Sequence, residues 1–549
     1  MRKLHGCGAT LFPAPTTFRR AAWRHLSLVG RVALVLIALG SVAVASAARG
    51  DQLLYDEDGV KVSAALNAGV GVFAVSNVDF GAGNINTNAP FTGPVPPSQR
   101  RTDREWVEAF ALPTIGGEAP LSEYGTGYAL FGLTVQGTRG DGDAVSSLAQ
   151  QALRSTTSNH PTSVDLEDAV AGWRSAKLFA DSLGEDAIDL SYGNQPLLIG
   201  DGLVIASGVF NAFRRAGYYT APAAAFERTA ILKLNASSVR ANFFRLETRS
   251  DQDLLQGFDQ PMSKLAGFNA EWFQAAEKKE DEEAARHLWT LGAMYFRIYD
   301  ADSNPTVGRT GAFSFPASGP SPSLSTEANR DGLNVFSLRA AGSFFEFDRD
   351  ILLYGEYVGE ENGEPDRNVD AHAWYVEPGY RFSALPWTPQ INLRYARFTG
   401  DPNPDSRVKR SYDPLFFSTG PRGYGSWYLG EIYGYYLGTL SNIDVGMVKL
   451  SLLPLETVEV GAIYYDFRFD RLAQFKDPRI TSDHALDEVD LYANWLPAKW
   501  LTVSAVLGFA VPGEGFKQAA RAFVIDHGPP GRSVGKTMTL GELVVAVKF

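Results

Sequence analysis

The last ten residues of the chain, 540–549, constrain its fold more than any other stretch. Every second residue is apolar and the chain stops on an aromatic side chain; this apolar set is Leu543, Val545, Val547 and Phe549. Because side chains of a strand alternate between its two faces, the set lies on one face. The stretch therefore predicts a terminal β-strand with an apolar face. An ordinary edge strand that ends in Phe by chance is the alternative.

The other end of the chain reads as an export signal. Residues 1–47 carry six basic residues and no acidic one, an apolar run at 32–44, and the small residues Ala45-Ser46-Ala47. A basic region, an apolar region and a small-residue cleavage site are typical of a secretory signal peptide. The single cysteine, Cys7, lies inside this segment, so we expect no disulfide in the mature chain.

Charge and hydropathy narrow the class of protein. The full chain has a net charge of −12, and loss of six basic residues leaves 44 basic against 62 acidic residues, or −18. Such acidity argues against a nucleic-acid partner. Beyond the signal, no apolar run is long enough for a membrane helix. An exported chain of alternating strands fits a closed barrel, because lipid requires every backbone polar group to be paired internally.

Alternating runs of about ten residues define the expected strands. They begin with Val60–Ser76 and give about eighteen strands, an even number that returns the terminal strand to the periplasmic side. We expect a strand at 173–181 after a polar loop at 138–172, a periplasmic turn at 277–286, and an aromatic-rich external loop at 401–441. The prediction is an all-β fold: a transmembrane antiparallel β-barrel with long extracellular loops and short periplasmic turns. Residues 1–47 form the signal peptide and 48–549 a single barrel domain.

Several short motifs resemble a known family. They are Trp387-Thr388-Pro389, Leu393-Arg394-Tyr395, Thr399-Gly400-Asp401, Tyr412-Asp413-Pro414-Leu415-Phe416, Leu486-Asp487-Glu488-Val489-Asp490-Leu491 and Pro512-Gly513. In this order they resemble the alginate export family of outer-membrane porins. Upstream, Leu190-Ser191-Tyr192-Gly193-Asn194-Gln195 and Gly200-Asp201-Gly202 are similar to the Gly-Arg-Gln strand and the Gly-Asp turn of that family. The resemblance implies an eighteen-stranded barrel that conducts an anionic polysaccharide. Asn194 stands where the family pattern has Arg, which puts alginate itself in doubt.

The strand alternation also assigns charged residues to the channel interior. The lumen of a wide barrel is polar because water fills it. The basic residues expected to line it are Lys233, Arg240, Arg245, Arg249, Arg339, Arg381, Arg394 and Lys449. The acidic residues expected there are Glu356, Glu377, Glu459 and Asp490. Basic residues exceed acidic ones in this set, and a ring of cations attracts an anionic solute. Mutual neutralisation across strands is the alternative.

The residues give less support to an enzymatic or a metal-binding function. Histidines are few and scattered, so no spacing favours a serine–histidine hydrolase. Four loop acids offer oxygen ligands for Ca²⁺ without the spacing of a cage: Asp405, Asp413, Asp470 and Asp483. We expect no metal and no cofactor.

The sequence therefore predicts a channel rather than an enzyme. We expect a monomer in the bacterial outer membrane that passes a hydrophilic, anionic poly- or oligosaccharide. Its expected partners are outer-membrane lipid, the barrel assembly machinery through the terminal strand, and the solute itself. An uptake porin for small solutes is the first alternative, and an outer-membrane hydrolase is the second.

Overall fold

The computed structural model describes most of the chain beyond the expected signal peptide. The described residues are 52–81, 102–141, 162–208, 216–217, 219–222, 224–249, 262–275, 287–301, 330–364, 368–418, 420–438, 440–522 and 533–549. The expected signal peptide at 1–47 and the expected periplasmic turn at 277–286 lie outside them. Leu53–Lys548 forms one compact unit, described below.

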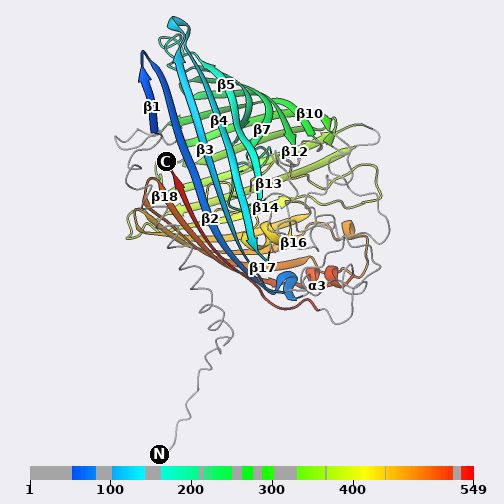
Figure 1. Ribbon diagram of the computed structural model, residues 1–549. Helices are drawn as coiled ribbons and strands as arrows, with labels where there is room; N and C mark the ends of the chain where they lie inside the picture. Colours follow the sequence, from blue (N-terminus) through cyan, green and yellow to red (C-terminus); the bar gives the residue numbers. More distant parts are fainter. Residues whose placement is uncertain are drawn as a thin grey trace, which may run out of the picture. The chain divides into compact units, whose positions relative to one another are not determined.

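Nineteen strands belong to one antiparallel sheet (Figure 1). They are β1 (Gln52–Glu57), β2 (Val60–Ser76), β3 (Arg104–Pro120), β4 (Thr126–Gly140), β5 (Thr162–Arg174), β6 (Ile188–Pro196), β7 (Ala225–Ala236), β8 (Val239–Arg249), β9 (Met262–Ala275), β10 (His287–Ala301), β11 (Asn334–Gly342), β12 (Ile351–Asn362), β13 (Val369–Arg381), β14 (Gln390–Phe398), β15 (Ile443–Leu455), β16 (Val458–Phe469), β17 (His484–Ala498), β18 (Leu501–Pro512) and β19 (Met538–Lys548).

The eighteen strands β2–β19 close into a barrel. Each pairs with the next along the chain, and the terminal strand β19 pairs with β2. The expected fold class and strand number are therefore confirmed. The short β1 is an addition that the sequence reasoning missed; it pairs with β2 in a hairpin.

One expected strand is wrong. Residues 175–187 form a series of tight turns, and β5 ends before them at Arg174. Backbone hydrogen bonds from Leu178 N to Ser175 O and from Leu183 N to Phe179 O close these turns locally. The strand itself occupies the end of the segment expected to be a loop, because its inward face carries Ser163 and Asp165 rather than apolar residues.

Exposure alternates along the strands as a lipid-facing barrel requires. In β17 and β18, Leu491 stands opposite Leu507, and both are exposed on the outer face. Asp490, the residue before Leu491 in β17, is fully buried on the inner face. In β19, Leu543 is exposed and Glu542 is buried. The outer surface is therefore apolar and the inner surface polar, the pattern of a transmembrane barrel.

The connections differ between the two ends of the barrel. At one end they are short, such as residues 237–238 between β7 and β8 and 456–457 between β15 and β16. At the other end most are long, and α3 (Glu514–Ala520) lies there beside β17. Bacterial barrels place short turns in the periplasm. In the described part of the chain no helix is long and apolar enough to cross a membrane.

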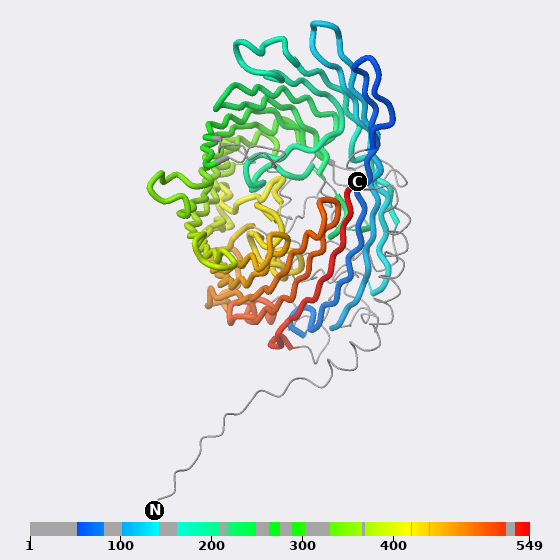
Figure 2. Tube along the Cα trace, turned by 90° about the vertical axis from the view of Figure 1, so that its left-hand side faces the viewer, coloured from blue at the N-terminus to red at the C-terminus, as the bar shows by residue number. Residues whose placement is uncertain are grey.

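Two long connections fold into the barrel instead of projecting from it. The described parts of the β14–β15 connection (residues 399–442) and of the β6–β7 connection (residues 197–224) lie inside the ring of strands (Figure 2). In the β14–β15 connection, Tyr428, Ile432 and Tyr433 are almost completely buried. Their burial explains why polar, inward strand residues have so little exposure. The core of this protein is therefore the filled lumen.

Candidate functional site: the filled lumen

A buried ion-pair network joins the barrel wall to the β14–β15 connection. Its centre is Glu377 on β13, whose Oε2 accepts from Arg394 Nε at 2.7 Å and from Arg422 Nη2 at 2.5 Å. Asn392 Nδ2 donates to its other oxygen at 2.9 Å. Arg394 Nη1 also donates to the carbonyl of Trp427 at 2.9 Å, so this wall cation holds the connection directly.

Arg422 belongs to the β14–β15 connection and bridges to the β6–β7 connection. Its Nη1 donates to Asp201 Oδ2 at 3.0 Å, and the same oxygen accepts from the Tyr375 hydroxyl at 2.8 Å. Burial alone would lower the pKa of Arg422, but the carboxylates of Glu377 and Asp201 outweigh it and hold that pKa above its usual value. Its guanidinium also lies 4.0 Å from the centroid of the Tyr354 ring, a cation–π contact.

The two connections also share backbone hydrogen bonds. Ile205 and Phe416 form a parallel bridge, and Ser418 N donates to Gly202 O at 2.8 Å. Gly200 packs directly against Arg339: a Cβ there would lie 2.7 Å from Arg339 Cδ, and its φ of +58° favours glycine. We call the described parts of the two connections together the plug.

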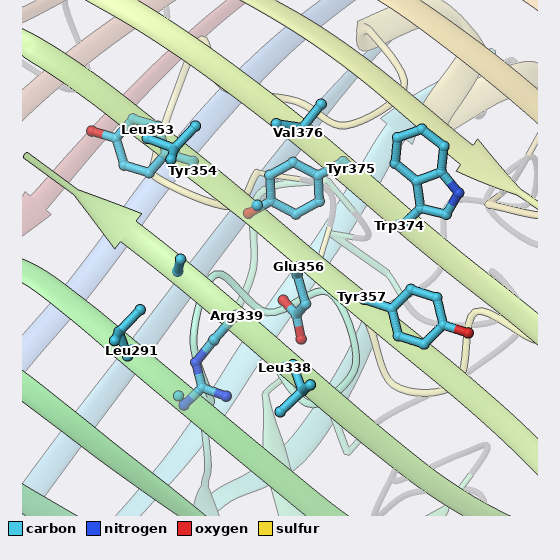
Figure 3. Close-up of a pocket in the computed structure, with 13 residues that line it drawn as sticks. Leu291, Leu338, Arg339, Leu353, Tyr354, Glu356, Tyr357, Trp374, Tyr375 and Val376 are labelled. Carbon is cyan, nitrogen blue, oxygen red and sulfur yellow. The ribbon is translucent and has the colours of Figure 1, made fainter. Parts of the chain in front are cut away.

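A second ion-pair group lies on the wall beside the plug. Arg339 on β11 donates to Glu271 on β9 and to Asn269. Arg240 on β8 donates to the other oxygen of Glu271. Figure 3 shows Arg339 and Glu356 on neighbouring strands, at a hollow whose outer rim is apolar and includes Leu338. The cations of β8, β11 and β14 are thus each paired with a carboxylate.

The opposite part of the wall is acidic. Glu488 and Asp490 on β17, Glu542 on β19 and Glu108 on β3 all point inward and are buried. The plug covers three of them through a short segment that includes η5 (Tyr433–Leu437): backbone groups of residues 431–433 donate to the β17 carboxylates at 2.6–3.0 Å. The Tyr436 hydroxyl donates to Glu542 Oε1 at 3.1 Å.

The plug adds its own acid to this wall. Glu431 is buried, and its pKa is raised well above the usual value, first by burial and then by the neighbouring Glu542 and Asp490. Glu431 Oε2 and Asp490 Oδ1 are buried without a hydrogen-bond partner among the described residues. This acidic cluster comprises Glu431, Glu488, Asp490 and Glu542.

The structure places most of the residues assigned to the lumen on the inner face, in two groups. Deep in the barrel are Arg339, Arg394, Lys449, Glu356, Glu377 and Asp490, all buried. Nearer the short turns are Lys233, Arg240, Arg381 and Glu459, which retain exposure. Whether any of them contacts a solute stays a prediction.

Two assigned residues do not join these groups. Arg245 shares its strand face with Phe243, which is 46% exposed, and its guanidinium donates to Glu247 at 2.5 Å rather than into the lumen. The partner strand β7 has a register shift between Glu227 and Ala230, opposite this part of β8. The side chain of Arg249 lies outside the described residues.

The sequence reasoning missed several inward acids. Glu108, Glu271, Glu488 and Glu542 were not assigned to the lumen, and with them the inward acids outnumber the inward bases among the described strands. The expected excess of lumen cations is therefore wrong. Strand alternation was the available signal: Glu488 lies two residues from Asp490, on the same face.

Acidic loop residues considered for Ca²⁺ have basic partners. Asp413 Oδ1 and Oδ2 accept from Arg330 at 2.6 and 2.7 Å, and Asp405 Oδ1 accepts from Lys476 at 2.5 Å. In the described residues one group has metal-ligand spacing, Asp466, His484 and Asp487 on the outer face. Its carboxylates already pair with basic or hydroxyl neighbours: Asp466 Oδ2 with Arg468, and Asp487 Oδ1 with the Tyr464 hydroxyl.

The closed barrel and its polar, filled lumen define an outer-membrane channel of the porin class. The alginate export family model matches residues 283–522, which confirms the resemblance expected from the sequence over this part of the chain. The matched family model and the barrel fold both point to an outer-membrane channel. No curated protein matches the chain.

Solved structures of similar fold come from Pseudomonas aeruginosa. OccK2 (OpdF) is 10% identical with a TM-score of 0.49, and 89% of this chain and 97% of that chain are covered. OpdK, solved with vanillate, is 10% identical with a TM-score of 0.48, covering 88% and 98%. OccK5 (OpdH) is 8% identical with a TM-score of 0.47, also covering 88% and 98%.

Proposed function

We propose that this channel passes a hydrophilic, anionic poly- or oligosaccharide across the outer membrane by passive diffusion, without chemistry. The observation that carries the proposal is the family match over residues 283–522, combined with the position of the exposed inward cations. Those cations lie near the short turns, the end that bacterial barrels place in the periplasm.

The mouth at the short-turn end supports an anionic solute. Lys233 lies close to the β7–β8 turn, Arg240 follows the same turn, and Arg381 is the last residue of β13. The side chain of Arg240 is 39% exposed although it pairs with Glu271. Exposed cations at an entrance raise the local concentration of anions, and low salt strengthens the effect.

The plug also supports an anionic solute, because it covers acidic residues of the wall. Backbone N–H groups of residues 431–433 donate hydrogen bonds to the carboxylates of β17, which lie deeper than the mouth. An anionic solute is repelled less by carboxyl groups that are buried under the plug than by the same groups facing water. The deeper cation Arg394 lies over the rings of Tyr375 on β13 and Tyr428 of the plug, and all three side chains are buried between wall and plug.

The reversal potential in a salt gradient tests this proposal. The test variant carries Lys233→Gln and Arg381→Gln, two inward cations of the mouth. The control is Arg397→Gln, an outward residue paired with Asp444. We expect wild type to prefer anions and the test variant to shift towards cations, most clearly at low salt, while the control stays at the wild-type value. Equal potentials in all three proteins would remove the electrostatic support.

A small-solute uptake porin is the second candidate. The observation that favours it is the plug, because two connections inside the barrel leave less room for a polymer. The size of neutral sugars that pass through the reconstituted channel separates the two: a polymer channel passes long oligomers, whereas a small-solute porin stops at short ones.

We also propose how the protein reaches its place. Residues 1–47 act as the signal peptide of a single-domain barrel, and the barrel assembly machinery recognises β19 with its final Phe549. The protein works as a monomer in the outer membrane. The apolar outer faces of β17–β19 support contact with lipid around that part of the barrel.

A further inference from the structure

The acidic cluster lies buried between the plug and the wall. The backbone of residues 431–433 donates to Asp490 and Glu488, and the Tyr436 hydroxyl donates to Glu542. Glu431 Oε2 and Asp490 Oδ1 are buried without a hydrogen-bond partner among the described residues. A buried carboxyl group without a cation beside it favours its neutral, protonated form. The seated position of the plug therefore favours protons on this cluster.

The groups that act on Glu431 are acids and hydroxyls. Facing it are Glu488 and Asp490 from β17, Glu542 from β19, and the hydroxyls of Tyr424 and Tyr436 from its own connection. Glu108 of β3 adds a further like charge near Glu542. Among the described residues none of the four acids of the cluster forms an ion pair. Loss of their protons would put like charges together in a dry interior, which is strongly unfavourable.

A metal ion does not fit the cluster. In the described residues, Asp466, His484 and Asp487 are the one group whose ligand atoms lie within 4.8 Å of one another, and they are on the outer face. The carboxyl groups of the acidic cluster are more widely spread. Protons neutralise these carboxyl groups without bringing all four together.

The plug backbone sits directly on these groups, so it must respond to their charge. Gly430, with φ of +69°, lies so close that a Cβ there would be 2.6 Å from Glu488 Oε1. A Cβ on Gly508 of β18 would lie 3.1 Å from the Ile432 side chain. Repulsion inside the cluster therefore acts on the segment that fills the lumen.

We propose that the β14–β15 part of the plug is controlled by protons: it stays on the acidic wall while the carboxyl groups of Glu431 and its wall partners hold protons, and it leaves the wall when they ionise. The direction follows from the raised pKa of Glu431. A carboxyl whose pKa is raised on folding stabilises the seated state at low pH, and that stabilisation is lost as pH rises through the raised pKa. Alkaline pH therefore opens the lumen.

Potassium chloride conductance of the full-length protein in planar bilayers tests the plug from about pH 5 to about pH 9, a range that starts above the ordinary carboxyl pKa and covers raised carboxyl pKa values. Wild type should conduct more as pH rises. Glu431→Gln, neutral at every pH, should lose this rise. Asp405→Asn is the matched control, an exposed acid of the same connection paired with Lys476, and should keep it. A pH-independent wild type, or a Glu431→Gln protein with the wild-type rise, would overturn the proposal.

A reversible cross-link supplies the second arm. The pair Ile432→Cys and Gly508→Cys joins the plug to β18 in a chain whose single native cysteine, Cys7, lies in the expected signal peptide. The oxidised protein should keep the low conductance at every pH, and reductant should restore the rise. A rise that persists in the oxidised protein places the pH response elsewhere and refutes the plug.

This inference rests on the channel and not on its proposed substrate. Potassium chloride carries the current whatever the natural solute is. Failure of the anionic-saccharide proposal would leave the pH dependence intact, and a pH-independent current would leave the reversal potential free to support it.

Discussion

Removal of the charge of Glu377 should destabilise the protein more than removal of either cation that it holds. The side chain of Glu377 is 2% exposed and receives Arg394 and Arg422, whose side chains are 1% and 20% exposed. In Glu377→Gln, Arg422 keeps Asp201, but Arg394 loses the only carboxylate paired with it among the described residues. An uncompensated buried charge costs about 3–5 kcal/mol.

Removal of Arg394 should destabilise the protein less than removal of the charge of Glu377. In Arg394→Met, Glu377 keeps Arg422 and the amide of Asn392, so no charge is left alone. We expect a loss of about 1–3 kcal/mol, the cost of hydrogen bonds to a charged group. The double variant, Glu377→Gln with Arg394→Met, should recover much of the stability lost in Glu377→Gln alone, because the uncompensated cation is gone.

Urea unfolding of protein refolded in lipid vesicles measures these differences through the gel shift between folded and unfolded barrel. The three variants and wild type give the coupling free energy between Glu377 and Arg394. Equal losses for the two single variants, or a loss in Glu377→Gln below about 1 kcal/mol, would refute the assignment of Glu377 as the centre of the network.

Two further predictions concern the barrel and its assembly. Leu507→Arg places a cation on the exposed outer face of β18 and should lower the free energy of unfolding by about 2–4 kcal/mol if the site is near the membrane midplane, whereas Leu507→Ala should cost far less; urea titration in vesicles checks both. Deletion of Phe549 should reduce the yield of folded, heat-modifiable protein in cells, while Lys548→Ala should leave it near wild type, and normal yields without Phe549 would contradict the role of the terminal residue.

The barrel was predictable because lipid imposes one rule on every strand. Outward residues must be apolar, so an alternation such as Val489, Asp490, Leu491 is visible in the sequence alone. This rule did not locate β5, because its inward residues Ser163 and Asp165 are polar. The residues after Arg174 were predicted to be a strand, but they form a run of turns.

The contents of the lumen were not predictable in the same way. Glu377, Arg422 and Asp201 come from positions far apart in the chain, and nothing local marks them as partners. The aromatic-rich stretch 401–441 has the composition of an external loop as well as of a buried one. Its burial depends on complementary groups on β13, β14 and β17, which only the folded barrel brings together.

Blockade of single-channel current by oligosaccharides tests directly whether the solute is an anionic saccharide. Uronic-acid oligomers and neutral glucose oligomers of matched length are added on the side of the short turns, at low and high salt. We expect the anionic oligomers to interrupt the current at lower concentration and high salt to reduce this preference, because screening weakens the attraction of Lys233, Arg240 and Arg381. Equal blockade by both oligomers, or stronger blockade by the neutral one, would contradict an anionic saccharide as the solute.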